Sequence, residues 1–305
     1  MEERYNSFAG WCRRTYGRHL YRIALDAGMT CPNRDGTLDS RGCAFCAGGS
    51  GDFAVSYTGA KLSPEDLKVS GAKGKEGDYI AYFQSYSNTY AEPQRLRTLY
   101  TAALSDPLFA GLSIATRPDC FSEEIYDLLD ELKNTYKDKF IWIELGLQSV
   151  NEQSAVRMRR GYPLSVYENC VNRLHELHIP VITHVIIGLP GEDINDYLNT
   201  IHYLNKTGIS GIKIHLLHFL KGTDFGREYE EGLIKELSME EYVQAAALCL
   251  AHLDPDTVIH RLTGDGNGET LLGPQWSRNK KQVLNAIRHE MKMKGYVQGC
   301  LYEQK

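Results

Sequence analysis

Apolar segments of two kinds alternate between residues 21 and 217, and this alternation constrains the fold more than any other feature of the sequence. Short runs rich in β-branched and aromatic residues predict strands, and longer segments with apolar residues at helical spacing predict the helices between them. Such alternation is typical of βαβ units, which build a parallel sheet with right-handed crossovers. The predicted strands span residues 21–26, 79–85, 111–116, 140–147, 180–187 and 209–217.

The segments on either side of this core have weaker patterns. Residues 1–20 are polar and predict a short helix or irregular segment lying on the domain. The last eighty residues predict an acidic stretch to residue 237, helices over 238–253 and 277–294, a strand over 257–262 and a glycine-rich turn over 263–268. We therefore expect an N-terminal segment (1–20), a core domain (21–225) and a C-terminal α/β extension (226–305) packed on the core.

Composition and charge exclude several classes of protein. The chain is 42% hydrophobic and 24% charged, as globular proteins are. It has no apolar run close to the roughly 20 residues that span a bilayer, and Glu2, Glu3 and Arg4 stand where a signal peptide needs an apolar core. We therefore expect a cytoplasmic protein without membrane contact. The net charge of −5 argues against indiscriminate nucleic-acid binding but leaves local basic patches open.

Three of the eight cysteines lie in one loop that follows the first predicted strand. Cys43 and Cys46 have the C-x2-C spacing that lets two thiolates reach one metal site, and Cys31 precedes them across eleven residues rich in turn formers. Zinc sites closed by protein need four ligands, and common four-iron ferredoxin clusters use four cysteines. Three thiolates leave one iron open. The alternative is a zinc site completed by a histidine such as His19. We expect the scattered cysteines to be structural, including Cys120, Cys170, Cys249 and Cys300.

Polar residues stand at or near the ends of most predicted strands. In parallel α/β folds, ligands bind at the C-terminal edge of the strands, so these side chains should gather around one site. The polar residues are Gln84, Arg117, Asp119, Gln148, His184, Lys213 and His215, and Gly188 stands at the end of the fifth predicted strand. His184 could equally be a satisfied core histidine, and Arg117 and Asp119 could form a structural ion pair.

The motifs together resemble the radical S-adenosylmethionine superfamily, in the subgroup of the Elongator catalytic subunit and oxygen-independent coproporphyrinogen oxidase. They are the cysteine loop, Thr-Arg-Pro-Asp (116–119), Glu-Leu-Gly-Leu-Gln-Ser (144–149) and Gly-Leu-Pro-Gly-Glu (188–192). The first cysteine gap is longer than in the common C-x3-C-x2-C motif, but long first gaps occur in the Elongator-like subgroup. The resemblance covers residues 21–225. It implies a partial (βα)6 barrel of parallel strands in which the three cysteines hold a [4Fe–4S] cluster, whose open iron binds S-adenosylmethionine.

The resemblance also implies roles for individual residues. Gln148 and His184 would contact the ribose of S-adenosylmethionine, and the guanidinium of Arg160 would bind its methionine carboxylate. Reductive cleavage to a 5′-deoxyadenosyl radical would need a low-potential electron donor such as flavodoxin or ferredoxin. Main-chain groups around Phe83, Ile186 and Gly188 would hold the adenine. Candidate substrate contacts are Gln84, Arg117, Asp119, Lys213, His215 and Arg261.

Within the superfamily, residues 25–36 and 260–265 resemble a bacterial group related to YtqA. That group is implicated in modification of the tRNA wobble uridine, at the step that turns a carboxymethylaminomethyl group into an aminomethyl group. Arg13, Arg14, Arg18 and the basic helix over 277–294 could supply a phosphate-binding surface for tRNA. Two alternatives are a radical enzyme with a small-molecule substrate and a non-catalytic zinc-binding interaction module.

Overall fold

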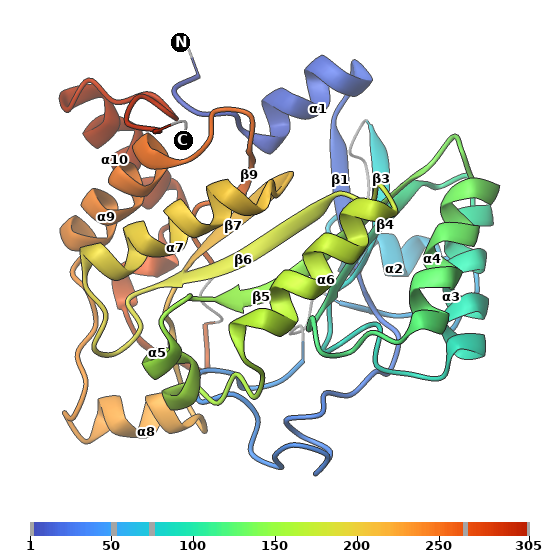
Figure 1. Cartoon of the computed structure of the whole chain (residues 1–305), viewed down its shortest axis with the longest axis horizontal. Helices are drawn as coiled ribbons and strands as arrows, with labels where there is room; N and C mark the ends of the chain where they lie inside the picture. Colours follow the sequence, from blue (N-terminus) through green and yellow to red (C-terminus); the bar gives the residue numbers. More distant parts are fainter. Residues whose placement is uncertain (1–2, 50–53, 73–76, 265–267, 304–305) are drawn as a thin grey trace.

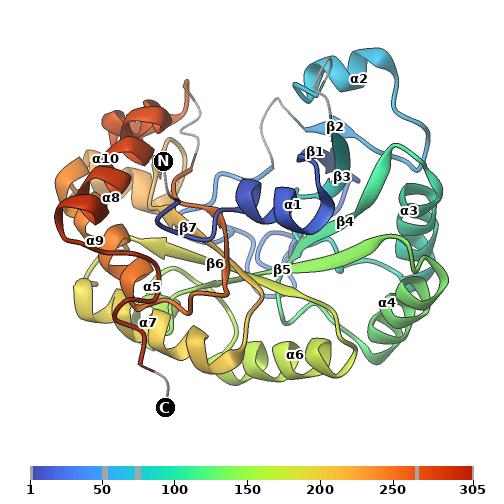
Figure 2. The ribbon, with the colours of Figure 1, turned by 90° about the horizontal axis from the view of Figure 1, so that it is seen from above.

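An eight-stranded parallel sheet forms the centre of the computed structural model, which describes residues 3–49, 54–72, 77–264 and 268–303. Its strand order is β2-β1-β3-β4-β5-β6-β7-β9, and it curves into an open half-barrel (Figures 1 and 2). The predicted parallel α/β fold, with six core strands and a further strand in the C-terminal extension, is confirmed. The strands are β1 (Leu20–Asp26), β2 (Val55–Ser56), β3 (Asp78–Phe83), β4 (Phe109–Thr116), β5 (Phe140–Gln148), β6 (Val181–Ile187), β7 (Gly211–Leu216) and β9 (Val258–Arg261).

Helices cover the convex face of this sheet. Figure 2 shows α3 (Pro93–Ser105), α4 (Glu123–Thr135), α6 (Leu164–Glu176) and α7 (Ile194–Thr207) side by side around the outside of the half-barrel. On α4, a stripe of apolar side chains at helical spacing, Ile125, Leu128, Leu129 and Leu132, is buried against the sheet. The short helices α2 (Pro64–Val69) and α5 (Glu152–Arg157) lie within the connections.

The two faces of the sheet differ in polarity because successive residues of a strand point to opposite sides. The convex side carries the main apolar core, for example Phe83, Leu145 and Ile214, all without measurable exposure. The alternate positions on the concave side carry charged and polar side chains. A buried polar face is expensive unless its groups are paired, so this side of the sheet is the place to look for a site.

Helix α1 (Phe8–Tyr16) lies across the end of the half-barrel where the strands begin (Figure 2). Its Phe8 and Trp11 rings pack against Trp142 of β5, with centroids 5.9 and 5.6 Å away. The cysteine loop follows β1 at the opposite end of the strands. The residues before the first strand therefore close one mouth of the half-barrel and leave the other to the loop.

The C-terminal segment continues the sheet and its outer helical layer. β9 pairs with β7, while α9 (Met239–His252) packs against α7 and α10 (Lys280–Met293) packs against α9. The acidic stretch yields only α8 (Asp224–Glu230), and residues Gln275–Arg278 form a 3-10 turn, η1, so the predicted last helix begins later than expected. The small sheet of β8 (Phe219–Leu220) and β10 (Leu271–Gly273), like β2, is too short to leave a periodic signal. Part of the predicted glycine-rich turn, residues 265–267, lies outside the described residues.

No helix in the described ranges is both long enough and apolar enough to cross a membrane. All eight cysteines are free. Cys120, Cys170 and Cys249 are buried, as a structural role predicts, but Cys300 is exposed because it lies in a surface turn after α10.

Candidate cluster and cofactor site

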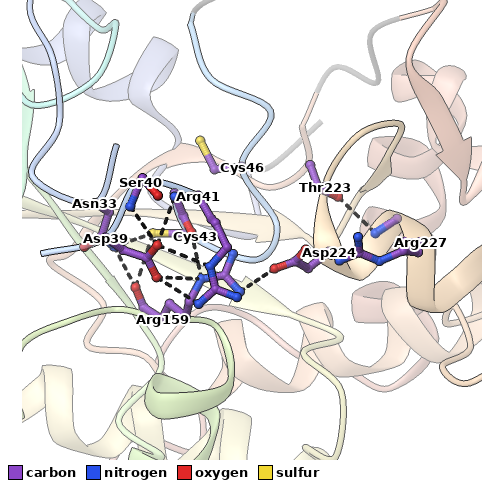
Figure 3. Close-up of polar contacts among 12 residues, drawn as sticks. Asn33, Asp39, Ser40, Arg41, Cys43, Cys46, Arg159, Thr223, Asp224 and Arg227 are labelled. Carbon is purple, nitrogen blue, oxygen red and sulfur yellow. Dashed lines mark hydrogen bonds and ion pairs between the residues drawn. The ribbon is translucent and has the colours of Figure 1, made fainter. Parts of the chain in front are cut away.

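Cys31, Cys43 and Cys46 occupy the loop between β1 and β2, and all three are free and partly buried. Asn33, which is 1% exposed, fixes one of them: its Nδ2 donates to Cys43 Sγ at 3.3 Å and to the carbonyl of Arg159 at 2.6 Å (Figure 3). Burial raises the pKa of the Cys43 thiol to about 11, so binding of a metal must release that proton.

The Arg159 guanidinium attaches the cysteine loop to two other parts of the chain. Its Nε donates to the Gly42 carbonyl at 2.9 Å and lies 3.5 Å from the Asp39 carboxylate, both in the loop. Its Nη1 pairs with Asp224 at the start of α8 (Figure 3). No role could be predicted for these residues from the sequence, because nothing in their spacing indicates that they meet. We call Asp39, Arg159 and Asp224 the loop clamp.

A cavity of about 360 Å³ lies between the cysteine loop and the concave face of the sheet. It brings together most residues that the sequence singled out. The predicted residues in its wall are Cys31, Cys43, Cys46, Gln84, Arg117, Gln148, Arg160, His184, Lys213, His215 and Arg261.

Phe83, Ile186, Gly188 and Asp119 are placed outside that wall. The Phe83 ring points to the convex side, where it packs against Tyr100 at a centroid distance of 5.1 Å. The Gly188 N–H donates to Tyr197 Oη at 3.2 Å. The Asp119 carboxylate accepts two hydrogen bonds from Arg117, so the ion pair considered from the sequence is present. Contact of the backbone around Phe83, Ile186 and Gly188 with adenine stays a prediction.

Arg160 is 3% exposed, and its guanidinium is engaged by protein. It donates to the Ser149 carbonyl at 2.9 Å, to the Tyr162 carbonyl at 3.0 Å and to the Glu152 carboxylate at 2.7 Å. Binding of the methionine carboxylate by Arg160 stays a prediction, and it requires the half-exposed Glu152 to yield one of these contacts.

Strained backbone surrounds the same region. Tyr86, Gln148 and Arg159 have positive φ angles of 63°, 70° and 57°, a conformation that costs non-glycine residues of the order of 1–3 kcal/mol. Tyr86 and Gln148 lie in the cavity wall, and Arg159 belongs to the loop clamp. Such strain persists where the surrounding structure imposes it, as ligand sites often do.

A buried carboxylate, Glu144, organises the floor of the cavity. Its side chain is fully buried and accepts hydrogen bonds from Ser113 Oγ at 2.6 Å, His184 Nε2 at 2.8 Å and Lys213 Nζ. Burial alone would raise the pKa of Glu144, but Lys213 and His184 hold it well below its usual value. Burial also lowers the pKa of Lys213 to about 7. Lys213 Nζ donates to Tyr82 Oη at 2.9 Å as well.

Glu144 lies within the motif at residues 144–149, but no role was predicted for it, and Tyr82 was not among the predicted site residues. The sequence did contain a signal for the role of Glu144, namely a glutamate in an otherwise apolar strand. A glutamate in such a position rarely faces a core without a partner. The alternative interpretation of His184, a core histidine with a satisfied ring, is correct in part, because its Nε2 is hydrogen-bonded to Glu144.

The structure contradicts a zinc site closed by His19. His19 precedes β1 whereas Cys31 follows it, and the seven residues of β1 alone separate the two by roughly 20 Å. Over residues 3–49, 54–72, 77–264 and 268–303, no three His, Cys, Asp or Glu side chains converge on one metal ion. Three separate thiols fit a multi-iron cluster, in which each cysteine ligates a different iron.

A parallel half-barrel with three free cysteines at the C-terminal edge of its strands defines a class of iron–sulfur enzyme, and family comparison identifies it. The radical SAM superfamily model matches residues 40–204, and the radical SAM C-terminal domain model matches residues 209–293. The chain belongs to the radical SAM superfamily, whose enzymes use a [4Fe–4S] cluster and S-adenosylmethionine.

Individual proteins of known sequence or structure are also similar to this chain. YtqA of Bacillus subtilis is 41% identical over 99% of this chain and 94% of its own length, which confirms the predicted resemblance. A tRNA-2-methylthio-N(6)-dimethylallyladenosine synthase of Fusobacterium nucleatum is 26% identical over 61% of this chain and 34% of its own length. The solved structure of Elp3 from the archaeon Methanocaldococcus infernus shares the fold, with a TM-score of 0.62, 15% identity, and coverage of 92% of this chain and 65% of that one.

Proposed function

We propose that this radical SAM enzyme modifies the wobble uridine of tRNA by converting its carboxymethylaminomethyl group into an aminomethyl group. The observation that carries the proposal is the single cavity whose wall joins the three cysteines to a polar floor. Bound there, the cluster and S-adenosylmethionine would supply a 5′-deoxyadenosyl radical. A low-potential donor such as flavodoxin or ferredoxin belongs to the proposal.

The chain's own residues have three tasks in this proposal. Cys31, Cys43 and Cys46 ligate the cluster, and Asn33 together with the loop clamp holds the loop that presents them. Gln148 and His184 orient S-adenosylmethionine. The sheet and the loop enclose the cavity, so a group at its floor is shielded from bulk water.

Recognition of tRNA is supported by similarity to a tRNA-modifying synthase and by exposed cations on the C-terminal segment. Arg278, at the end of η1, and Lys281, in the first turn of α10, are both exposed. Exposed cations of this kind can neutralise phosphates.

The arginines near the N-terminus do not share that location. Arg13 and Arg14 pair with Glu3, and Arg18 pairs with Asp78 where β3 begins. Helix α1, which carries Arg13 and Arg14, lies at the end of the half-barrel opposite the loop that follows β1 (Figure 1).

Mass spectrometry of tRNA nucleosides from cells with and without the gene tests the proposal. We expect the deletion strain to accumulate the carboxymethylaminomethyl nucleoside and the wild-type gene to restore the aminomethyl form. Cys43→Ser should not restore it, because the cluster loses a ligand. The matched control is Cys300→Ser, which replaces an exposed cysteine remote from the loop and should complement fully. An unchanged nucleoside profile in the deletion strain would refute the proposal.

A further inference from the structure

The segment between Cys31 and Cys43 folds back on itself and holds two of its residues beside the later cysteines. The Arg34 N–H donates to the Cys31 carbonyl at 2.8 Å, and the Gly42 N–H donates to the Asn33 carbonyl at 2.6 Å. These backbone hydrogen bonds fix Asn33 and Arg34 between the two ends of the segment. Two consecutive side chains therefore reach different cysteines of the loop.

Asn33 supplies a buried donor to Cys43. Its Nδ2 donates to Cys43 Sγ at 3.3 Å and to the Arg159 carbonyl at 2.6 Å (Figure 3). Because the carbonyl fixes the amide, the contact with sulfur has a defined geometry. Burial raises the pKa of the Cys43 thiol to about 11, and the hydrogen bond from Asn33 opposes this effect because it favours the thiolate.

Arg34 supplies a positive charge to Cys46. Its Nη2 donates to the Cys46 carbonyl, and its side chain lies in the wall of the same cavity as the three cysteines. Burial alone would lower the pKa of Arg34, but a hydrogen bond to the Cys46 side chain, followed by the nearby Tyr86 and Cys31, raises it. A guanidinium stays protonated in proteins, so Arg34 is a permanent cation beside Cys46.

Two glycines leave space for the Arg34 guanidinium. Gly42 and Gly48 have φ angles of 79° and 86°, which disfavour any residue with a side chain. A Cβ at Gly42 would stand 2.8 Å from Arg34 Cζ, and a Cβ at Gly48 would stand 3.2 Å from it. The backbone of the loop is therefore shaped to accept the guanidinium next to Cys46.

Arg117 is another cation near the cysteines, but its surroundings differ. Its guanidinium donates two hydrogen bonds to the Asp119 carboxylate and one to the Arg160 carbonyl. The charge of Arg117 is therefore balanced by a carboxylate, whereas Arg34 is directed at Cys46.

Hydrogen bonds to the sulfurs and net charge are among the factors that set the reduction potential of an iron–sulfur cluster. One-electron reduction adds a negative charge that the thiolates share. A donor or a cation beside the thiolates therefore stabilises the reduced form more than the oxidised form, and it does so more strongly where solvent screening is weak. The contacts of Asn33 and Arg34 both favour reduction.

We propose that Asn33 and Arg34 raise the reduction potential of the cluster through their contacts with Cys43 and Cys46. Both are positioning residues, because they act through the cysteines. The inference rests on the ligation of the cluster by the three cysteines in the proposed function, and it does not depend on the substrate. Its consequence for the partner is that an electron donor of less negative potential suffices to reduce the cluster.

Redox titration of the reconstituted cluster tests this proposal. The full chain is loaded anaerobically with iron and sulfide, poised at a series of potentials without S-adenosylmethionine, and followed by electron paramagnetic resonance of the reduced cluster. A midpoint potential does not depend on the fraction of molecules that carry a cluster. Incomplete loading of a variant therefore leaves the comparison valid.

We expect both substitutions to make the potential more negative. Arg34→Gln should lower the equilibrium constant for one-electron reduction about 10-fold, or about 59 mV, because a full charge is removed. Asn33→Leu should lower it about 3-fold, or about 28 mV, because one neutral donor is lost. Arg34→Lys keeps the charge without the planar fork, so its shift should be smaller than that of Arg34→Gln.

Arg41→Gln is the matched control, because it removes a guanidinium from the same loop. Arg41 is exposed, and its side chain donates to Asp39. The control should change the equilibrium constant by less than about 2-fold, or about 18 mV, since an exposed charge is screened by solvent. If Asn33→Leu holds no cluster, Asn33→Ser takes its place, because a single hydroxyl cannot replace both N–H donors.

Unchanged potentials in Arg34→Gln and in the Asn33 variant would overturn the proposal. A shift in Arg41→Gln as large as that in Arg34→Gln would overturn it as well, because the effect would then belong to the charge of the loop in general. Cys43→Ala separates the ligand assignment from this inference. If Cys43→Ala titrates with the wild-type signal, the ligand assignment fails. If it holds no cluster while the Asn33 and Arg34 variants titrate as the wild type does, ligation stands and only the roles of Asn33 and Arg34 are refuted.

Discussion

Substitution of Lys213 by methionine tests whether the floor of the cavity depends on one buried ion pair. The change keeps the length of the side chain and removes its charge. The Lys213 and Glu144 side chains are 3% and 0% exposed. After the substitution, the Glu144 carboxylate would keep the hydrogen bonds from Ser113 and His184, and Arg22 would remain 3.9 Å away.

Removing one partner of a buried ion pair typically costs about 3–5 kcal/mol, because the other charge is left buried and uncompensated. Arg22 and His184 remain near Glu144, so we expect the lower end, about 3 kcal/mol. For a chain of this size, about 2 °C of melting temperature corresponds to 1 kcal/mol, which gives a decrease of about 6 °C.

The double variant Lys213→Met/Glu144→Gln removes the uncompensated charge together with its partner. It should recover about 1–2 kcal/mol of the loss, or about 2–4 °C, because the neutral amide that replaces the Glu144 carboxylate costs less to bury than the charged group. Coupling between the two positions, not the size of either single effect, identifies the ion pair as the cause.

Anaerobic differential scanning calorimetry of the wild type, both single variants and the double variant, at matched iron content, gives the required comparison. Lys206→Met, an exposed change on α7, is the control and should shift the melting temperature by less than about 1 °C. The reasoning is refuted if Lys213→Met melts within about 2 °C of the wild type, or if the double variant melts lower than Lys213→Met.

Two further predictions concern the loop clamp and the backbone that follows α6. Arg159→Gln should speed the loss of the cluster to a chelator by about 10-fold, as followed by visible absorbance, because two part-buried ion pairs disappear. Arg157 pairs with Glu228 away from the loop, so the control Arg157→Gln should change the rate less than about 2-fold. Equal rates for the two variants would contradict the clamp. His178→Gly should stabilise the protein by about 1 kcal/mol in calorimetry, because His178 follows the end of α6 at a φ of 53°, and a loss of stability would show that its side chain matters more than its backbone.

The strands, the crossover helices and the cysteine loop could be predicted from the sequence because each is encoded locally. Runs of β-branched residues, helical spacing of leucines on α4 and turn formers between Cys31 and Cys43 depend only on neighbours along the chain. The gathering of polar residues from the strand ends could also be predicted, since a parallel sheet brings all C-terminal ends to one edge. That rule gathered Gln148, His184 and Lys213 correctly into one cavity wall.

Other features were decided by the tertiary structure alone. Lys213 meets Glu144 across 69 residues and Tyr82 across 131, and Arg159 meets Asp224 across 65; no local pattern records which residues oppose one another. The alternation of side chains along the strands decides that Glu144 faces the cavity while Phe83 faces the helices. The path of the chain places α1 at the end of the half-barrel opposite the cysteine loop (Figure 1). The sequence alone thus determined the class of fold and the three thiolates. The hydrogen-bonded network around Glu144 exists only after folding, because it is made by side chains from strands that the chain order separates.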